Sequence, residues 1–142
     1  MPVHLLDVNI LIALAWPNHV HHVRAHAWFA TNAGEGWATC PLTQCGFVRI
    51  SSNPRIIPEA RSPHEAIELL RRMVSHPRHI FWTADISVAE EPFIAQYGII
   101  GHRQVTDAYL LALATRRGGR LATFDRAITS LSADAGVTVI EA

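Results

Sequence analysis

Short apolar runs alternate with amphipathic stretches along the whole chain. The segment Val3–Asp7 is apolar until it ends on an acid, which is typical of a buried strand whose carboxyl end meets a functional loop. Runs of the same kind predict further strands at Gly36–Cys40, His79–Trp82, Leu121–Asp125 and Val137–Ile140. Between these runs the apolar residues recur at helical spacing.

Capping signals help to place the helices. Asn18 suits a helix cap, and apolar residues at helical spacing from Val20 to Ala30, followed by Gly34, predict a helix near 19–32. Ser62-Pro63-His64-Glu65 combines a cap, a first-turn proline and a capping-box acid, so a helix should follow it through Met73. Other helices are expected over Leu42–Ser51, over Gln104–Arg117, around Ile128 and, weakened by Pro92, over Ser87–Tyr97. A proline-punctuated loop, Ser52–Ser62, lies among them.

Strands that alternate with helices favour a parallel sheet with helices on both faces. The predicted fold class is α/β, a three-layer α/β/α sandwich around a mostly parallel sheet of four to five strands. Neither a linker nor an internal repeat divides the sequence, so residues 1–142 are expected to form one domain. A chain of 142 residues is long enough to bury a core without disulfides.

Composition narrows the class of protein. With 49% hydrophobic and 17% charged residues, disorder and collagen-like repeats are excluded. The longest apolar run, Ile10–Trp16, is too short to span a membrane, and no basic stretch precedes it. We therefore expect a cytoplasmic protein with no membrane association. Its 12 basic residues, all arginines, balance 12 acidic ones, so net charge neither demands nor excludes a nucleic-acid partner.

The cysteines and histidines leave one metal hypothesis open. Cys40 and Cys45 form neither a redox pair nor a four-ligand zinc set. His19, His22 and His26 would share one helical face and could bind zinc. No cysteine or carboxylate accompanies them, so ordinary surface histidines are the favoured interpretation.

Three acids carry the candidate chemistry. Asp7 and Asp125 end two predicted strands, and in α/β sheets ligands bind outside the carboxyl ends of the strands. Asp107 follows Thr106 in the first turn of a predicted helix, from where it could reach the same edge. Three such carboxylates would repel one another without a cation, and oxygen ligands suit Mg²⁺ or Mn²⁺. Taken singly, each acid has a structural explanation, such as a helix cap for Asp107.

Four segments in sequence order resemble PIN-domain ribonucleases, and specifically VapC-type toxins. They are Leu5–Leu11, Gly36–Thr43, His102–Leu111 and Leu121–Asp125. The resemblance extends over nearly the whole chain, which makes it more specific than any single motif.

The resemblance implies a metal-dependent endoribonuclease toxin of a type II toxin-antitoxin system. Such an enzyme uses Mg²⁺ or Mn²⁺ and a metal-activated water to hydrolyse RNA. It is restrained by a cognate VapB-type antitoxin that occupies the active-site groove, and it is usually a homodimer. Asp7, Asp107 and Asp125 match the family's acids and are the expected catalytic and metal-binding residues. Thr123 matches a small hydroxyl residue of the family and is expected to form a hydrogen bond with the metal-binding acids. Asn9 is expected to contribute to the site in the same supporting way.

One position departs from the family. A glutamate is usual where this chain has Gln44, and an amide adds no negative charge, so metal binding should be weakened. Glu59 and Asp85 are candidate substitutes for the lost acid. For RNA contact the nearest arginines are Arg49 and Arg103.

Two alternatives follow from this departure and from the first acid. The chain could be a catalytically weakened PIN-fold module that binds RNA or an antitoxin. A haloacid dehalogenase-type phosphatase also begins with an acid after its first strand. That family needs a second aspartate where Asn9 stands, and this chain contains no lysine to neutralise the phosphate.

Overall fold

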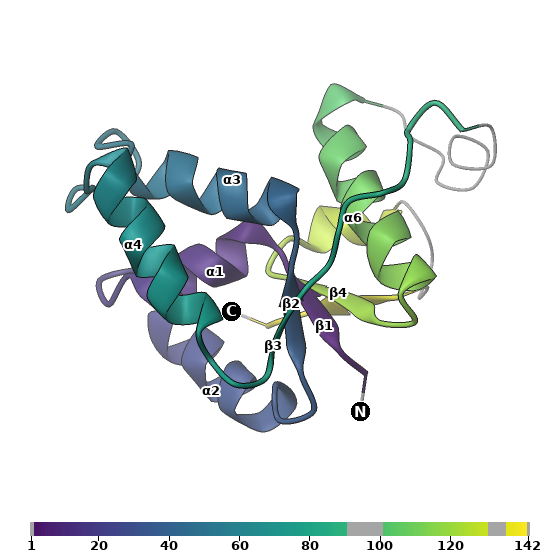
Figure 1. Cartoon of the computed structure of the whole chain (residues 1–142), viewed down its shortest axis with the longest axis horizontal. Coiled ribbons are helices and arrows are strands. Elements are labelled where there is room, and N and C mark those ends of the chain that lie inside the picture. Colours follow the sequence, from purple (N-terminus) through teal and green to yellow (C-terminus); the bar gives the residue numbers. More distant parts are fainter. Residues whose placement is uncertain (1, 91–100, 131–135, 142) are drawn as a thin grey trace.

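A central parallel sheet organises the chain. The computed structural model describes residues 2–90, 101–130 and 136–141, and within them five parallel strands lie in the order β3-β2-β1-β4-β5 (Figure 1). Each of the five predicted strands is therefore confirmed, with the first strand of the chain at the centre of the sheet. The strands are β1 (His4–Leu6), β2 (Trp37–Thr39), β3 (His79–Phe81), β4 (Arg120–Thr123) and β5 (Val137–Val139).

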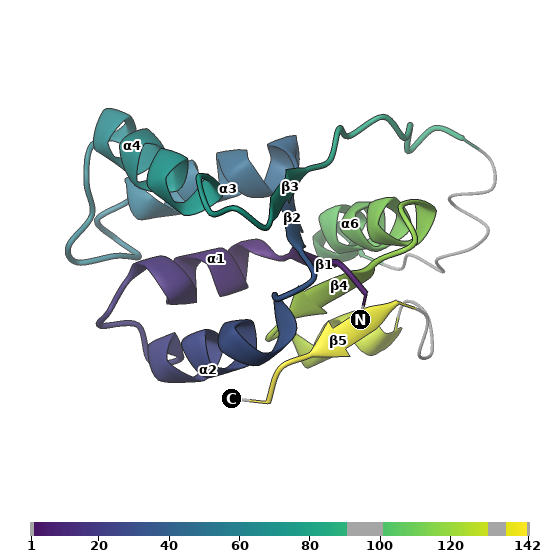
Figure 2. The same ribbon diagram turned by 60° about the horizontal axis from the view of Figure 1, so that its bottom comes forward.

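Helices cover both faces of this sheet, which confirms the three-layer α/β/α arrangement (Figure 2). Alternate strand residues face opposite layers: Leu6 packs with α1–α4, whereas Leu5 packs with α6. The helices are α1 (Val8–Ala15), α2 (His22–Asn32), α3 (Pro41–Ser51), α4 (Pro63–Val74) and α6 (Val105–Arg116), with 3₁₀ turns η1 (His102–Gln104) and η2 (Arg126–Ser130). Within the described residues, no helix has the length and apolar content needed to cross a membrane.

Helix α1 is absent from the elements expected from the sequence. Its residues Ile10–Ala13 are all buried, because α1 lies between the sheet and the outer helices. A helix that is buried on every side shows no alternation of apolar and polar positions, so the periodicity that identifies amphipathic helices is missing. The remaining signal was Asp7, which caps the helix.

Helix α2 begins at His22, three residues later than predicted, and turns a different face to the core. Val20 and Val23, expected on the buried side, are 85% and 80% exposed. Ala25 is buried instead, with Trp28 and Phe29 packed against the core. Large aromatic side chains gain more from burial than valine or alanine, and they decided the orientation.

The other helices agree with the sequence more closely. α4 starts directly after Ser62, whose hydroxyl oxygen accepts the Glu65 N–H at 3.2 Å. α3 begins one residue before the predicted start, and α6 differs by one residue at each end. Of the weak helix expected over Ser87–Tyr97, residues 88–90 form a turn, and 91–97 lie outside the described residues.

Candidate active site

Asp7 joins the central strand to α1. Its N–H donates to the carbonyl oxygen of Ala122 at 2.9 Å, which continues the pairing of β1 with β4. Its Oδ1 accepts the Val8 N–H at 2.8 Å and so caps α1. Its Oδ2 accepts the Thr123 hydroxyl at 2.7 Å. Both carboxylate oxygens are held, and the direction of this side chain is fixed.

The Thr123 hydroxyl is the centre of a small network. Its oxygen accepts hydrogen bonds from Asn9 Nδ2 and from the Asp125 N–H, each at 3.1 Å. Its only proton is therefore committed to Asp7. The Asn9 Oδ1 in turn accepts the Phe124 N–H at 3.3 Å, which ties the first turn of α1 to the end of β4. Asn9 and Thr123 thus lie beside the acids and orient Asp7.

The other two acids come from different elements. Asp107 lies on α6, on the opposite face of the sheet from α1, and Asp125 follows β4. Asp107 is half-buried in the first turn of α6. Asp125 is exposed two residues beyond β4, and its Oδ1 accepts the Ala127 N–H at 2.9 Å, at the start of η2. Three segments distant in sequence thus bring an acid to the carboxyl edge of the sheet.

The three acids interact electrostatically. Burial, followed by the charges of Asp7 and Asp125, raises the pKa of Asp107 to about 6. Burial also raises the pKa of Asp7, against the hydrogen bonds from Thr123 and Val8 that lower it, and the charge of Asp125 adds to the rise. These carboxylates form one cluster of like charge, whose ionised form is disfavoured without a counter-ion.

The chemistry of the cluster fits Mg²⁺ or Mn²⁺, because its donors are carboxylate oxygens. Among residues 2–90, 101–130 and 136–141, however, no three His, Cys, Asp or Glu side chains are grouped so as to hold a metal ion. The acids are near enough to perturb one another, but they do not form a closed ligand shell. A bound cation would have to draw the carboxylates together.

Gln44 is engaged outside this cluster. Its Nε2 donates to the hydroxyl oxygen of Thr39 at 3.0 Å. Together with Cys45 and Arg49, it lines a hollow of about 470 Å³ between α3 and α4. Arg49 is exposed and makes no ion pair within the described part of the chain. Arg103 belongs to η1, and its side chain lies outside the described residues.

Glu59 and Asp85, the candidate substitutes for a fourth acid, lie away from the cluster of acids. Asp85 accepts from Arg117 Nη2 at 3.4 Å. Arg117 directly follows the last residue of α6, and Asp107 lies in the first turn of that helix. The length of α6, about 18 Å, therefore separates Asp85 from the end of the helix that carries Asp107. Glu59 accepts from Asn18 Nδ2 at 3.3 Å, beyond the end of α1 opposite to Asp7. Neither carboxylate joins the cluster.

The histidines expected on one helical face have structural partners. The His22 Nδ1 lies 2.7 Å from the carbonyl oxygen of Ala13, and the His26 Nε2 lies 2.9 Å from that of Leu14. These rings therefore bind the last carbonyls of α1, which have no partner within the helix. The zinc hypothesis finds no support in this arrangement.

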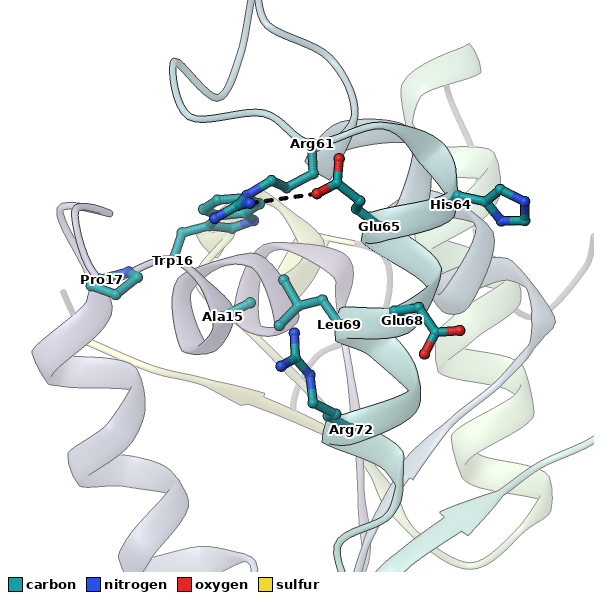
Figure 3. A pocket seen from close by; sticks show the side chains of 9 residues that line it. All are labelled: Ala15, Trp16, Pro17, Arg61, His64, Glu65, Glu68, Leu69 and Arg72. Carbon is teal, nitrogen blue, oxygen red and sulfur yellow. Dashed lines mark ion pairs between the residues drawn. The ribbon is translucent and has the colours of Figure 1, made fainter.

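A second hollow, of about 750 Å³, lies between the end of α1 and α4, away from the acids. Figure 3 shows Trp16 and Pro17 on one side and the side chains of α4 on the other, with the ion pair between Arg61 and Glu65 across its rim. Arg72 also lines it and makes no ion pair among the described residues. Its walls thus combine an aromatic ring with guanidinium groups.

Comparison with known proteins agrees with the sequence resemblance. The PIN domain family matches residues 4–133. Ribonuclease VapC38 of Mycobacterium tuberculosis is 47% identical over 137 residues, which cover 96% of this chain and 95% of that protein. Ribonuclease VapC44 of the same organism is 46% identical over 134 residues, covering 94% of this chain and 93% of that protein.

Solved structures share the fold at low sequence identity. VapBC2 from Rickettsia felis, crystallised with a DNA fragment from its promoter, gives a TM-score of 0.61 at 11% identity, covering 98% of this chain and 99% of that chain. FitAcB from Neisseria gonorrhoeae gives 0.54 at 19% identity, covering 95% and 96%. With the family match and the close relatives, these results show that the chain belongs to the PIN-domain family, among its VapC ribonucleases.

Proposed function

We propose that this protein is a metal-dependent endoribonuclease, the toxin of a type II toxin-antitoxin pair. The observation that carries the proposal is the cluster of Asp7, Asp107 and Asp125, in which Asp125 disfavours ionisation of Asp7, and both disfavour ionisation of Asp107. A site that gathers like charges gains most from a bound cation. The VapC relatives, which are named ribonucleases, support RNA as the substrate.

The protein's own residues prepare this site. A divalent cation, when bound, neutralises the acids, polarises a phosphodiester and makes water more acidic. Thr123 and the Val8 N–H hold Asp7 in one orientation, and Asn9 fixes the Thr123 hydroxyl. Without a cation the pKa of Asp107 is raised to about 6, so a bound cation would favour its ionised, ligating form. Arg49 supplies positive charge for the RNA backbone.

The same structure favours one alternative, a catalytically weakened module that binds RNA or an antitoxin. Gln44 stands where the family usually has an acid, and its amide nitrogen is bonded to Thr39. Loss of that acid would leave three carboxylates to hold the cation. RNA binding that survives both chelation and Asp7→Ala would indicate this module.

Cleavage of cellular RNA separates the two functions. Purified protein and Asp107→Ala are incubated with total RNA in Mg²⁺, Mn²⁺ or excess chelator, and new 5′ ends are mapped. We expect discrete cuts that require metal and are missing in the variant. Wild-type protein that binds RNA but never cuts it would contradict the enzyme and favour the module.

We also propose a VapB-type antitoxin as partner, seated in the hollow of Figure 3. An apolar side chain would meet Trp16, while an acidic group of the partner would meet Arg72, since Arg61 already pairs with Glu65. Arg72→Glu should weaken the complex by tenfold or more in a titration with the cognate antitoxin, whereas Arg24→Glu, on α2, should not. Equal affinity of both variants would place the antitoxin elsewhere.

A homodimer that acts in the cytoplasm completes the proposal. Leu42, Val88 and Val105 are 42–47% exposed around one apolar hollow between α3 and α6. A second copy would cover these side chains. Leu42→Asp should then yield monomers in sedimentation, and Val23→Asp, at an exposed valine of α2, should leave the mass unchanged. A monomeric wild type would contradict this part of the proposal.

A further inference from the structure

A buried hydroxyl connects α3 to the edge strand of the sheet. Thr39, at the end of β2, is fully buried. Its Oγ1 lies 3.0 Å from Gln44 Nε2 on α3 and 2.7 Å from His79 Nε2 on β3. Gln44 and His79 are therefore the two ends of one hydrogen-bonded chain, with Thr39 as its only link.

One proton sets the direction of this chain. The Thr39 hydroxyl has one proton, and among the described residues it has no hydrogen-bond partner besides Gln44 and His79. The Gln44 amide is a donor, so only His79 can accept that proton. If His79 Nε2 donated as well, the buried hydroxyl proton would have no acceptor, which is unfavourable. His79 Nε2 must then be an unprotonated acceptor. If His79 were protonated, Nε2 would donate to Thr39, and the hydroxyl proton would turn to Gln44. The Gln44 amide would have to reverse to offer its oxygen as acceptor.

The surroundings of His79 favour its neutral form. Burial lowers the pKa of His79, and His76 lowers it further. Trp37 of β2 packs edge-on against the ring, with ring centroids 4.8 Å apart. The charged groups near it are the adjacent Arg78 and, when protonated, His76. None of the described carboxylates pairs with either histidine.

His76 is held as an acceptor as well. Its Nδ1 accepts the indole N–H of Trp37 at 3.3 Å and the Arg78 N–H at 3.1 Å. Both donors are N–H groups, so this nitrogen cannot carry a proton in the same arrangement. Phe29 of α2 packs edge-on against the His76 ring. Trp37 thus contacts both histidine rings, and the chain of hydrogen bonds to Gln44 begins at His79.

We propose that His79, acting through Thr39, is a positioning residue that decides which end of the Gln44 amide faces outward from α3. With neutral His79, the Gln44 carbonyl oxygen has no partner among the described residues and can accept a hydrogen bond. With protonated His79, the amide NH₂ faces outward and can donate, for example to a phosphate oxygen. Only the consequence for RNA rests on the proposed function, since the coupling itself is a property of the fold.

Nitrogen NMR of the full-length protein tests the coupling directly. The Gln44 side-chain amide, assigned by its loss in Gln44→Leu, and the His79 ring nitrogens are followed from about pH 7.5 to pH 5. We expect an unprotonated His79 Nε2 at the upper end. The Gln44 amide should shift with the same midpoint as His79.

Three variants separate positioning from a merely structural role. In Thr39→Val the Gln44 shift should vanish while His79 still titrates, and Thr39→Ser should restore it. In His79→Gln the shift should also vanish, whereas the control His64→Gln, an exposed histidine of α4, should retain it. A protonated Nε2 at pH 7.5, or a Gln44 shift that persists in His79→Gln, would overturn the proposal. Loss of the fold in Thr39→Val leaves His79→Gln to decide.

Cleavage assays on the same proteins show what the coupling does. If the proposed function holds, the cleavage rate of wild-type protein should follow the midpoint of His79, and this dependence should be missing in His79→Gln. Coupled NMR shifts in a protein that never cuts RNA would refute the nuclease and leave the coupling intact. Cleavage without coupled shifts would refute the coupling and leave the nuclease intact.

Discussion

Asp7 serves folding and the proposed chemistry with the same carboxylate. It caps α1 through Oδ1 and receives the Thr123 hydroxyl at Oδ2. Strand endings and the family resemblance were enough to single out Asp7, Asp107 and Asp125 from the sequence. The sequence could not show that the Thr123 hydroxyl donates its hydrogen bond to Asp7, because the two residues are 116 positions apart. Gln44 was assigned to the site by the family resemblance alone, and its contact with Thr39 depends on the tertiary structure.

Removal of the Asp107 charge should stabilise the metal-free protein. A carboxyl whose pKa is raised in the folded state binds protons more tightly there than when unfolded. Stability is therefore lost as pH rises from about 4 through about 6. Asp107→Asn avoids this loss, and we expect a gain of about 1–2 kcal/mol at pH 7.5, allowing for solvent screening of a half-exposed group.

Urea unfolding in chelator measures this gain, and the same variant should be inactive. Near pH 4 the two proteins should have nearly equal stability, which provides the internal control. Added Mn²⁺ should reverse the order, because a ligand that binds only the folded state stabilises wild-type protein. Equal stabilities at pH 7.5 in chelator would show that Asp107 does not belong to a repulsive cluster.

His4 should make the fold sensitive to acid. It is buried in β1 with its Nδ1 unpartnered, and burial, then Arg120, lowers its pKa. The unfolded chain takes up a proton below about pH 6.5 before folded His4 does, so stability is lost as pH falls. His4→Phe retains a ring against Trp28 and cannot be protonated. The variant should be within about 1 kcal/mol of wild type at pH 7.5.

Below pH 6.5 the variant should become the more stable protein, by up to about 1.4 kcal/mol for each pH unit. Other histidines titrate equally in both proteins, so the difference in unfolding free energy isolates His4. Parallel stability curves down to pH 5 would mean that water or a neighbour satisfies Nδ1.

At the scale of elements, the five strands and the amphipathic helix α4 were predictable from the sequence, whereas the buried helix α1 was not. Ser62 and Glu65 predicted the start of α4 because the hydrogen bonds of a capping box join residues that are close in the sequence. α1 has no polar face, so its sequence pattern cannot distinguish it from a strand. α2 carries two apolar faces, and the aromatic pair Trp28 and Phe29 outweighed Val20 and Val23.

The contact between α3 and α1 depends on a glycine. A Cβ at Gly46 would lie 2.7 Å from Val8 Cγ2, in the first turn after Asp7. Gly46→Ala should therefore destabilise the protein by about 1–3 kcal/mol, although alanine favours a helix by about 1 kcal/mol. Thermal unfolding of the double variant Gly46→Ala/Val8→Ala should recover part of the loss. Gly34→Ala, where no atom lies within 4 Å, is the matched control.

Two results would contradict this packing argument. Gly46→Ala could prove as stable as wild-type protein, which would mean that α3 shifts at no cost. Alternatively, the double variant could lose more than the sum of the single losses, which would mean that Val8 contributes by burial and does not obstruct the alanine.

At the scale of the molecule, the topology of the sheet brings the acids together, whereas the net charge does not indicate which face binds a partner. Parallel strands in the order β2-β1-β4 bring the ends of β1 and β4 together, and α6 adds Asp107 at the same edge. Alternating strands and helices were sufficient to predict that the acids share one edge of the sheet, but not the order of the strands. The faces that meet a partner could not be predicted, because a net charge of zero conceals their local sign.

The number of arginines that contact phosphates sets how strongly RNA binding depends on salt. Each phosphate contact on a single strand contributes about −0.7 to the slope of log K against log salt. Contacts from Arg49 and Arg103 alone would give a slope of about −1.4. Arg49→Gln should therefore reduce the slope by about 0.7 and weaken binding uniformly across sequences.

Fluorescence anisotropy in Ca²⁺, between 50 and 300 mM salt, measures this without cleavage. Arg24→Gln, an exposed arginine on α2, should leave the slope unchanged. A slope steeper than about −4, or one insensitive to Arg49, would mean that RNA crosses another face of the protein, such as that of Arg71 and Arg72 on α4.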